Sequence, residues 1–188
     1  MSILHLLPVG EIDGRVLEDL RRGLAGQFHA RCEVLEQRLE PDFAFHSERQ
    51  QYHSTEILRR LEKYAPPKCW RLLGVSGQDL FMPILTFVFG EAQLNNTCAL
   101  VSTHRLRQEF YGLPPDPELL RQRLLKEAVH ELGHTLGLTH CKDYDCAMAA
   151  SHSVEWIDLK GTSFCADCRT RAGNQLPAAA VKKWFEIF

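Results

Sequence analysis

The sequence of 188 residues lacks several features that would assign it to a broad class. It has no basic excess, with 22 Lys and Arg against 24 Asp and Glu, so nothing indicates binding to nucleic acid or to acidic membranes. The longest apolar run, Phe81 to Phe89, is interrupted by Pro83 and is far too short to span a bilayer. No internal repeat is visible. The hydrophobic content of 45 % is typical of a soluble globular protein, which we expect to be a monomer.

A secretory signal is also missing. The N-terminus, MSILHLLPVG, has a short apolar run with no basic region before it, and Glu11 and Asp13 follow soon after. We expect this run to be a first strand, which leaves no room ahead of it for a prodomain. A cytoplasmic location is therefore predicted, where thiols stay reduced and available as metal ligands.

Hydrophobic periodicity predicts strands that alternate with helices in the first half of the chain. The expected strands are 2–7, 29–35, 69–75, 86–93 and 98–102, and the expected helices are 13–27, 54–64, 117–136 and 177–188. Ser54 or Thr55 is expected to cap the second helix. We expect a loop over 36–52 and find 149–173 poorly periodic. Three further cysteines fall in strands and are expected to be buried as small hydrophobes: Cys32, Cys69 and Cys98.

The most informative stretch reads KEAVHELGHTLGLTHC. His130 and His134 are four residues apart and so lie on one face of a helix, with Glu131 at the flank of the pair. Gly137 can take a left-handed conformation that ends the helix and brings His140 back toward the other two. Three imidazoles can bind one Zn²⁺ and leave the fourth tetrahedral position open for water, whose proton Glu131 can accept. These groups suffice to hydrolyse an amide.

The rest of this helix agrees with that interpretation. Asp116 is suited to the N-cap and Pro117 to the first helical position, which predicts a helix about 30 Å long. An apolar stripe is expected opposite the histidines, formed by Leu125, Ala128, Val129, Leu132 and Leu136. The alternative, that the histidines are ordinary residues on a solvated face, leaves Gly137 and His140 unexplained.

Two close cysteine pairs follow, Cys141-x4-Cys146 and Cys165-x2-Cys168. Four thiolates can bind a second Zn²⁺ in a closed structural site, which would contribute on the order of 10 kcal/mol to folding of the tail. Two disulfides are the alternative, and are disfavoured because nothing marks the chain as secreted. A redox role for the second pair is disfavoured because no thioredoxin-like βαβ pattern surrounds it. Cys141 directly follows the third histidine, so a structural zinc would fix the loop that carries this ligand.

HELGHTLGLTH resembles the extended histidine motif of the metzincin zinc peptidases, and the four cysteines narrow the resemblance to the archaemetzincins. FVFGEA, VSTHRL and QYHSTEIL are also similar to that family, so the resemblance covers nearly the whole chain. It implies an α+β, zincin-like fold with a mixed, twisted five-stranded sheet, an antiparallel edge strand, two packing helices and a long active-site helix. It further implies one catalytic domain with an N-terminal lobe, 1–136, and a small C-terminal lobe, 137–188.

The resemblance also implies a function: a zinc-dependent peptidase that holds two Zn²⁺ and uses Glu131 as general base. Met148 would form a methionine turn beneath the imidazoles, and a substrate peptide could add as a strand beside 86–93. His152 and Tyr144 are candidates for contacts near the zinc. Two alternatives stay open. One is a zinc-stabilised peptide-binding or interaction module with little activity. The other is a narrow aminopeptidase, which needs an acidic residue to hold a free α-amine.

Overall fold

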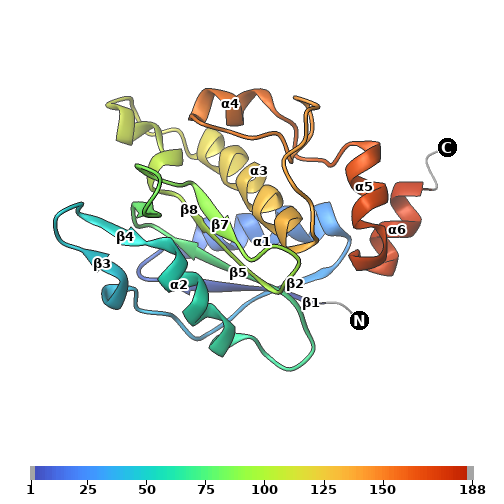
Figure 1. Ribbon diagram of the computed structural model, residues 1–188, viewed down its shortest axis with the longest axis horizontal. Helices are drawn as coiled ribbons and strands as arrows, with labels where there is room; N and C mark the ends of the chain where they lie inside the picture. Colours follow the sequence, from blue (N-terminus) through green and yellow to red (C-terminus); the bar gives the residue numbers. More distant parts are fainter. Residues whose placement is uncertain (1–2, 186–188) are drawn as a thin grey trace.

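A mixed five-stranded sheet in the order β2-β1-β5-β8-β7 forms the centre of the computed structural model, which describes residues 3–185 and side chains through Val181 (Figure 1). The parallel strands are β1 (Ile3–Val9), β2 (Arg31–Val34), β5 (Cys69–Ser76) and β8 (Cys98–Ser102). β7 (Gly90–Ala92) pairs antiparallel with β8 at one edge. The expected mixed sheet with an antiparallel edge strand is therefore confirmed.

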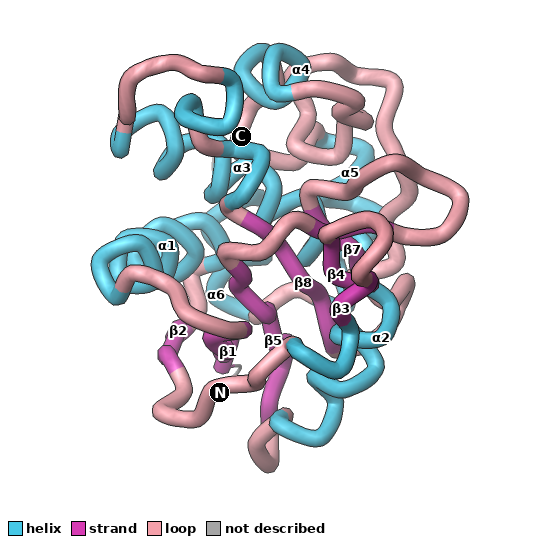
Figure 2. The backbone as a smooth tube through the Cα atoms, turned by 90° about the vertical axis from the view of Figure 1, so that its left-hand side faces the viewer, coloured by secondary structure: helices cyan, strands magenta, loops and turns pink. Residues whose placement is uncertain are grey.

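Helices cover both faces of this sheet. α1 (Gly14–Phe28) and α3 (Pro117–Thr135) lie on one face, and α2 (Ser54–Leu61) lies on the other (Figure 2). α1 and α2 each bury an apolar stripe: Leu17, Leu20, Leu24 and Phe28 in α1, and Ile57, Leu58 and Leu61 in α2. Each such side chain contributes about 1.5–3 kcal/mol when it leaves water, and this burial keeps both helices on the sheet.

Two short segments differ from the sequence-based expectation. The segment 36–52 is not only a loop, because it contains β3 (Phe45–His46) and most of β4 (Gln51–His53). These strands join β6 (Leu80–Phe81) in a second, three-stranded sheet. Strands of two or three residues are too short to show an alternating pattern.

The expected strand 86–93 is also shorter than predicted, since only β7 pairs with the main sheet. The residues before it bend away, and Val88 forms a single bridge to Leu80 of the small sheet. The β7–β8 connection is a hairpin whose turn includes Asn95 in a left-handed conformation, with φ of 56°. The main-chain N–H of Asn95 donates to His134 O at 3.0 Å, so this turn is tied to the end of α3.

The chain after α3 forms a layer of short helices: α4 (Val154–Leu159), α5 (Ala166–Ala172) and α6 (Ala178–Phe185). α4 and α5 fall in the stretch that looked aperiodic, because helices of six and seven residues show too little of a period. The expected last helix, 177–188, is confirmed in part by α6, and its last three residues, 186–188, lie outside the described part of the chain. No helix within residues 3–185 is long and apolar enough to cross a membrane.

Candidate active site

α3 places the first two histidines as the sequence predicts. The Asp116 side chain accepts from the N–H of Leu119 at 2.9 Å, and Pro117 begins the helix. The stripe opposite the histidines is buried at Ala128, Val129, Leu132 and Leu136 and half-buried at Leu125. At the C-terminus Gly137 has φ of 81°, and its N–H donates to His134 O at 2.9 Å. Only glycine adopts this conformation without strain, and the chain reverses here.

This reversal brings His140 next to His130 and His134. The ring centroids are 4.7 Å apart for the first pair and 5.3 and 5.2 Å from His140, and one nitrogen of each ring lies within 4.8 Å of the others. Nδ1 of His130 lies 2.8 Å from Ala147 O, and Nδ1 of His134 lies 2.7 Å from Leu138 O. A carbonyl only accepts, so both Nδ1 atoms carry the proton and both Nε2 atoms are bare acceptors.

The two bare Nε2 atoms of His130 and His134 are 3.1 Å apart. Two lone pairs that face each other at this distance repel unless a cation lies between them. Tetrahedral zinc with Zn–N bonds of about 2.0–2.1 Å would hold two such nitrogens about 3.3 Å apart. Burial lowers the pKa of all three imidazoles, His140 included, which favours the neutral form that binds metals. The residues present therefore fit a zinc ion.

The four cysteines that follow the histidines in the chain come together, with their sulfur atoms within 4.8 Å of one another. The Sγ atoms of Cys141 and Cys165 are 3.8 Å apart, far too long for a disulfide bond. Zinc with four Zn–S bonds of about 2.3 Å would hold sulfurs about 3.8 Å apart. The N–H groups of Met148 and Cys165 point at the sulfur of Cys146, at 3.4 and 3.3 Å. Such donors stabilise a thiolate, so this cluster also fits a zinc ion.

One short loop connects the two clusters. The N–H of Cys141 donates to Met148 O at 2.9 Å, which closes the loop between the third histidine and the methionine. Met148 is fully buried, and its sulfur packs against the α3 backbone at Gly133, where a Cβ atom would overlap it. Gly133 lies between the two histidines of α3, so Met148 supports this turn of the helix from below.

Glu131 belongs to α3, and its side chain is buried against the edge strand β7. Burial and the nearby carboxylate of Glu127 raise its pKa well above the ordinary value, while the ammonium of Lys160 acts in the opposite direction. A Cβ atom on Gly90 of β7 would lie 2.6 Å from Cγ of Glu131. The strand can therefore approach this carboxylate only because position 90 is glycine.

A buried ion pair that the sequence analysis did not predict lies beside these groups. Nζ of Lys160 is 2.7 Å from Oε1 of Glu127, and both side chains are almost fully buried. The same ammonium donates to Ala149 O at 3.3 Å and lies 3.4 Å from Nδ1 of His130. The pair links α3 to the segment after Met148. The sequence holds one indication that Glu127 belongs to the site, because this residue is four positions before Glu131 and so lies on the same helix face. Nothing local marks Lys160.

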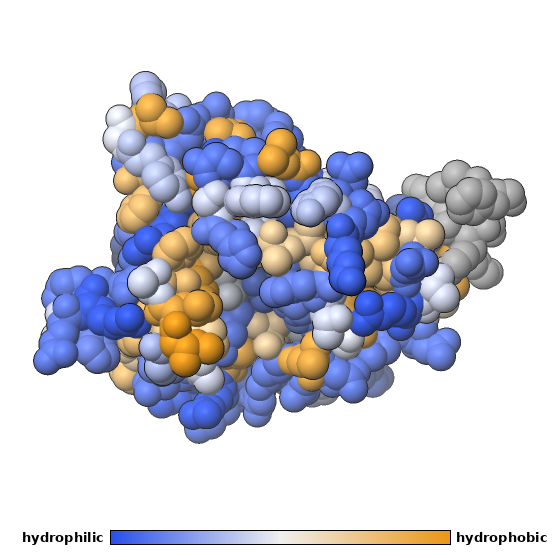
Figure 3. Space-filling model, turned by 45° about the horizontal axis from the view of Figure 1, so that its top comes forward, coloured by the Kyte–Doolittle hydropathy of each residue, from blue (hydrophilic) through white to orange (hydrophobic). Residues whose placement is uncertain are grey.

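A cleft of about 560 Å³ opens over the histidines. One side is formed by β7 and the residues before it, and the other by residues 150–152. Figure 3 shows this upper face of the molecule, where apolar and polar areas alternate. His152 lines the cleft as expected, whereas Tyr144 does not. Tyr144 is 74 % exposed, and the centroid of its ring lies 6.4 Å from that of Trp156.

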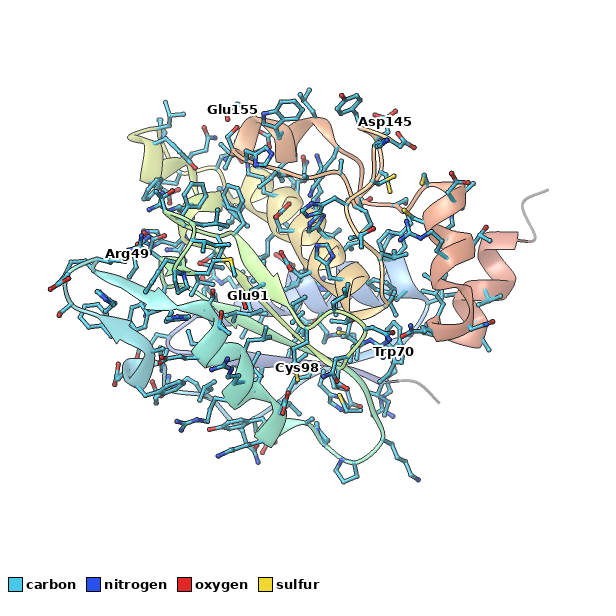
Figure 4. All side chains as sticks on the ribbon, viewed as in Figure 1. Arg49, Trp70, Glu91, Cys98, Asp145 and Glu155 are labelled. Carbon is cyan, nitrogen blue, oxygen red and sulfur yellow. The ribbon has the colours of Figure 1, made fainter. Side chains whose placement is uncertain are left out.

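Glu91 is a further acid of the cleft, on β7 next to α2 (Figure 4). Its carboxylate accepts from the hydroxyls of Ser54 and Thr55, the latter at 2.8 Å. The expectation that one of these hydroxyls caps α2 is wrong, because the N-cap is His53 and no side chain caps the helix. Both hydroxyls instead hold Glu91 in place.

The fold and the histidine cluster are those of a metallopeptidase, and comparisons with known proteins agree. The sequence model of the family described as Peptidase family M54 matches residues 44–173 of this chain. The archaemetzincin of Methanocaldococcus jannaschii is 42 % identical over 161 residues, which cover 86 % of this chain and 87 % of that protein. The archaemetzincin of Archaeoglobus fulgidus is 39 % identical over 168 residues, or 89 % of this chain and 97 % of that protein.

Solved structures are similar as well. The crystal structure of the Archaeoglobus fulgidus archaemetzincin, complexed with malonate, has a TM-score of 0.79 at 37 % identity and covers 90 % of this chain and 99 % of that one. A zinc-dependent peptidase from Methanocorpusculum labreanum has a TM-score of 0.83 at 28 % identity, with the same coverage of both chains. The chain belongs to peptidase family M54, the archaemetzincins.

Proposed function

We propose that this metallopeptidase hydrolyses peptide bonds with a zinc ion held by His130, His134 and His140 and with Glu131 as general base. One observation carries the proposal: the Nε2 atoms of His130 and His134 face each other at 3.1 Å in a cleft, beside the buried carboxylate of Glu131. A second zinc, held by the four cysteines, would be structural and would fix the loop between His140 and Met148.

The chemistry divides between the metal and the protein. Zinc, when bound, supplies a Lewis acid that polarises the scissile carbonyl and lowers the pKa of water. Glu131 accepts the proton of the attacking water on a carboxylate oxygen and delivers it to the leaving amine. Its raised pKa suits a group that must both take and give a proton. The carbonyls of Ala147 and Leu138 keep the two α3 imidazoles oriented.

The substrate backbone would lie along β7. This strand ends the order of the main sheet, so its outer edge is available to an added peptide strand. Gly90 lets that edge approach Glu131 closely, which would bring a paired peptide bond beside the general base. We infer that Met148 forms the methionine turn of this site, and that residues 1–136 and 137–188 make one catalytic domain.

The two alternatives are less well supported. A peptide-binding module without chemistry needs no carboxylate beside its metal, yet Glu131 is buried against Gly90 at that place. An aminopeptidase needs a free acid for the α-amine. The other cleft acids among the described residues are both engaged, Glu91 by Ser54 and Thr55, and Glu127 by Lys160. These contacts favour cleavage within a peptide.

The decisive experiment is a peptide-library digest of the wild type and of Glu131→Ala, with zinc content measured on the same samples. General base catalysis is worth about 10²–10⁴-fold in rate, so the variant should lose that factor and keep its zinc. Glu48→Ala, which removes an exposed glutamate outside the cleft, should cleave like the wild type. Full activity of Glu131→Ala would refute the role of the base, and chelator-resistant cleavage would refute the metal.

We also propose a cytoplasmic monomer. None of the seven cysteines is in a disulfide, all of them within the described part of the chain. Free thiols persist in reducing compartments, which supports this location.

A further inference from the structure

We propose that the cleft selects substrates with a bulky apolar side chain, which packs against a wall formed by the segment 82–89 (the apolar wall). This inference rests on the proposed peptidase function and names its substrate class. The wall presents Met82, Leu85, Phe87 and Phe89 to the cleft.

The orientation of the apolar wall follows from its packing. Phe87 and Phe89 pack with the core that contains α3 and Met148, while Val88 packs with the core beneath α2. Alternate residues of an extended segment point to opposite sides, so the two phenylalanine rings face the side of the sheet that carries the histidines. Their rings meet edge to face, with centroids 5.1 Å apart.

The wall is exposed where a substrate would touch it. Leu85, which lines the cleft, is 46 % exposed, whereas Phe89 at the inner end of the wall is buried. Leaving such side chains in water is unfavourable, and a bulky apolar residue of a peptide would remove them from it.

The wall is also held in shape before any substrate arrives. The guanidinium of Arg105 lies 4.2 Å from the ring centroid of Phe87 and is itself paired with Asp79 at 2.6 Å. The Gln51 amide donates to Thr86 O at 3.0 Å and Arg49 donates to Leu85 O at 3.2 Å. A preformed apolar surface loses little entropy on binding.

The charges of the cleft act in the same direction. Its described acidic side chains are Glu91, Glu127 and Glu131, and the one ammonium nearby, Lys160, is buried and paired with Glu127. Away from the proposed zinc, a substrate carboxylate would meet these acidic side chains and no unpaired ammonium among them, whereas an apolar side chain meets the wall.

The test compares two matched peptides. A digest of a degenerate peptide library by the zinc-loaded wild type, read by mass spectrometry, locates the preferred position. Two peptides that differ only there, Leu against Ser, then give kcat/KM. One well-packed apolar side chain is worth about 10- to 100-fold, and the wild type should prefer Leu by that factor. Equal cleavage of the two peptides would overturn the proposal.

Variants assign the preference to the wall. Leu85→Ser should reduce the Leu-to-Ser ratio several-fold and leave the zinc content unchanged. Leu113→Ser makes the same change at a residue of similar exposure, 52 %, outside the cleft, and should keep the wild-type ratio. An unchanged ratio in Leu85→Ser would remove the wall as the source of the preference.

Binding separates this inference from the proposed function. Fluorescence anisotropy of the same labelled peptides with Glu131→Gln measures recognition without turnover. If this variant binds the Leu peptide about 10-fold or more tightly than the Ser peptide while the wild type cleaves neither, the peptidase proposal fails and the apolar preference stands. If the wild type cleaves both equally and the variant binds both equally, only the preference fails.

Discussion

The two ligand clusters of this chain adjoin at His140 and Cys141, yet they are built differently. The histidine cluster lies at the floor of a cleft, and its rings are oriented by carbonyl oxygens. The cysteine cluster has four ligands, and main-chain N–H groups point at the sulfur of Cys146. Three ligands with an open side suit catalysis, and four ligands that close the shell suit structure.

The difference shows how the chain divides its tasks. The histidines depend on a rigid helix, a methionine beneath it and the buried pair of Lys160 with Glu127. The cysteines lie on a loop and at a helix of only seven residues, α5, and Cys146 and Cys168 are themselves part of what these segments bury in the main core. The closed cluster therefore supports the fold around it, whereas the fold around the open cluster supports the site.

The largest expected effect contrasts His134→Ala with Cys168→Ala. The histidine variant should stay folded, hold one zinc per chain and lose peptide cleavage. The cysteine variant removes a ligand of the proposed structural zinc, which would contribute on the order of 10 kcal/mol, comparable to the stability of a whole domain, about 5–15 kcal/mol. It should therefore lose cooperative unfolding and both metals. Zinc analysis and thermal unfolding of the two proteins make the comparison.

Cys98→Ala is the matched control for that contrast. Cys98 is a buried thiol in β8 (Figure 4) and is not one of the four clustered cysteines; burial raises its pKa to about 12. Its loss should leave both zincs in place. Two zincs per chain in His134→Ala, or a stably folded Cys168→Ala with full zinc, would contradict the division of tasks.

Sequence and structure agree best where a motif fixes local geometry. The spacing of His130 and His134 and the glycine at 137 predict a helix, a left-handed turn and a converging third ring, and each of these is a short-range consequence of chain geometry. The four-cysteine cluster was likewise predictable, because its members form two local pairs.

Long-range supports of the site were not predictable. Lys160 reaches Glu127 from 33 positions away in a segment with no motif. The hydroxyls of Ser54 and Thr55 suggested a helix cap, but in the folded chain they donate hydrogen bonds to the distant carboxylate of Glu91. A single sequence records such partners only as isolated polar residues, so nothing in it identifies the pair.

The buried pair of Lys160 and Glu127 supports the histidine cluster, and substitution of either partner tests this role. Lys160→Met leaves the carboxylate of Glu127 buried without its partner, which should cost about 3–5 kcal/mol in the free energy of unfolding. The double variant Lys160→Met/Glu127→Met removes both charges and should recover most of that loss. Urea unfolding measures both. Arg121→Met, which removes an exposed partner of Glu118 on the same helix, should barely change stability. If the double variant is as unstable as the single one, the pair is not what supports this site.

A smaller effect is expected when one glycine beside each cluster is replaced, Gly133 for the histidines and Gly161 for the cysteines. A Cβ at Gly133 would overlap the sulfur of Met148, and a Cβ at Gly161 would lie 2.6 Å from Asp145 O in the cysteine-bearing loop. Each alanine variant should lose about 1–3 kcal/mol through overpacking. Gly133→Ala should reduce cleavage, while Gly161→Ala should speed the loss of zinc to a chelator. Gly26→Ala, which meets nothing within 4 Å, should be neutral or stabilising. Identical effects of the first two variants on both readouts would argue against separate roles.

The smallest effect concerns pH and the apolar wall, which belongs to the open site alone. Burial raises the pKa of Asp79, but the bonds donated by Arg105 and Gln51 outweigh it and hold the pKa below the ordinary 3.8. A carboxyl whose pKa is lower in the folded state contributes stability above pH 3.8 and loses it as the pH falls through the folded value. Asp79→Asn should thus cost about 1–2 kcal/mol at pH 7, and the gap to the wild type in urea unfolding should narrow below about pH 4. Acid removes the metals from the wild type and from Asp79→Asn equally. The difference in unfolding free energy between these two proteins therefore reports the contribution of the Asp79 carboxylate. A gap that stays constant down to pH 3 would mean that the wall is held by packing of Phe87 and not by charge.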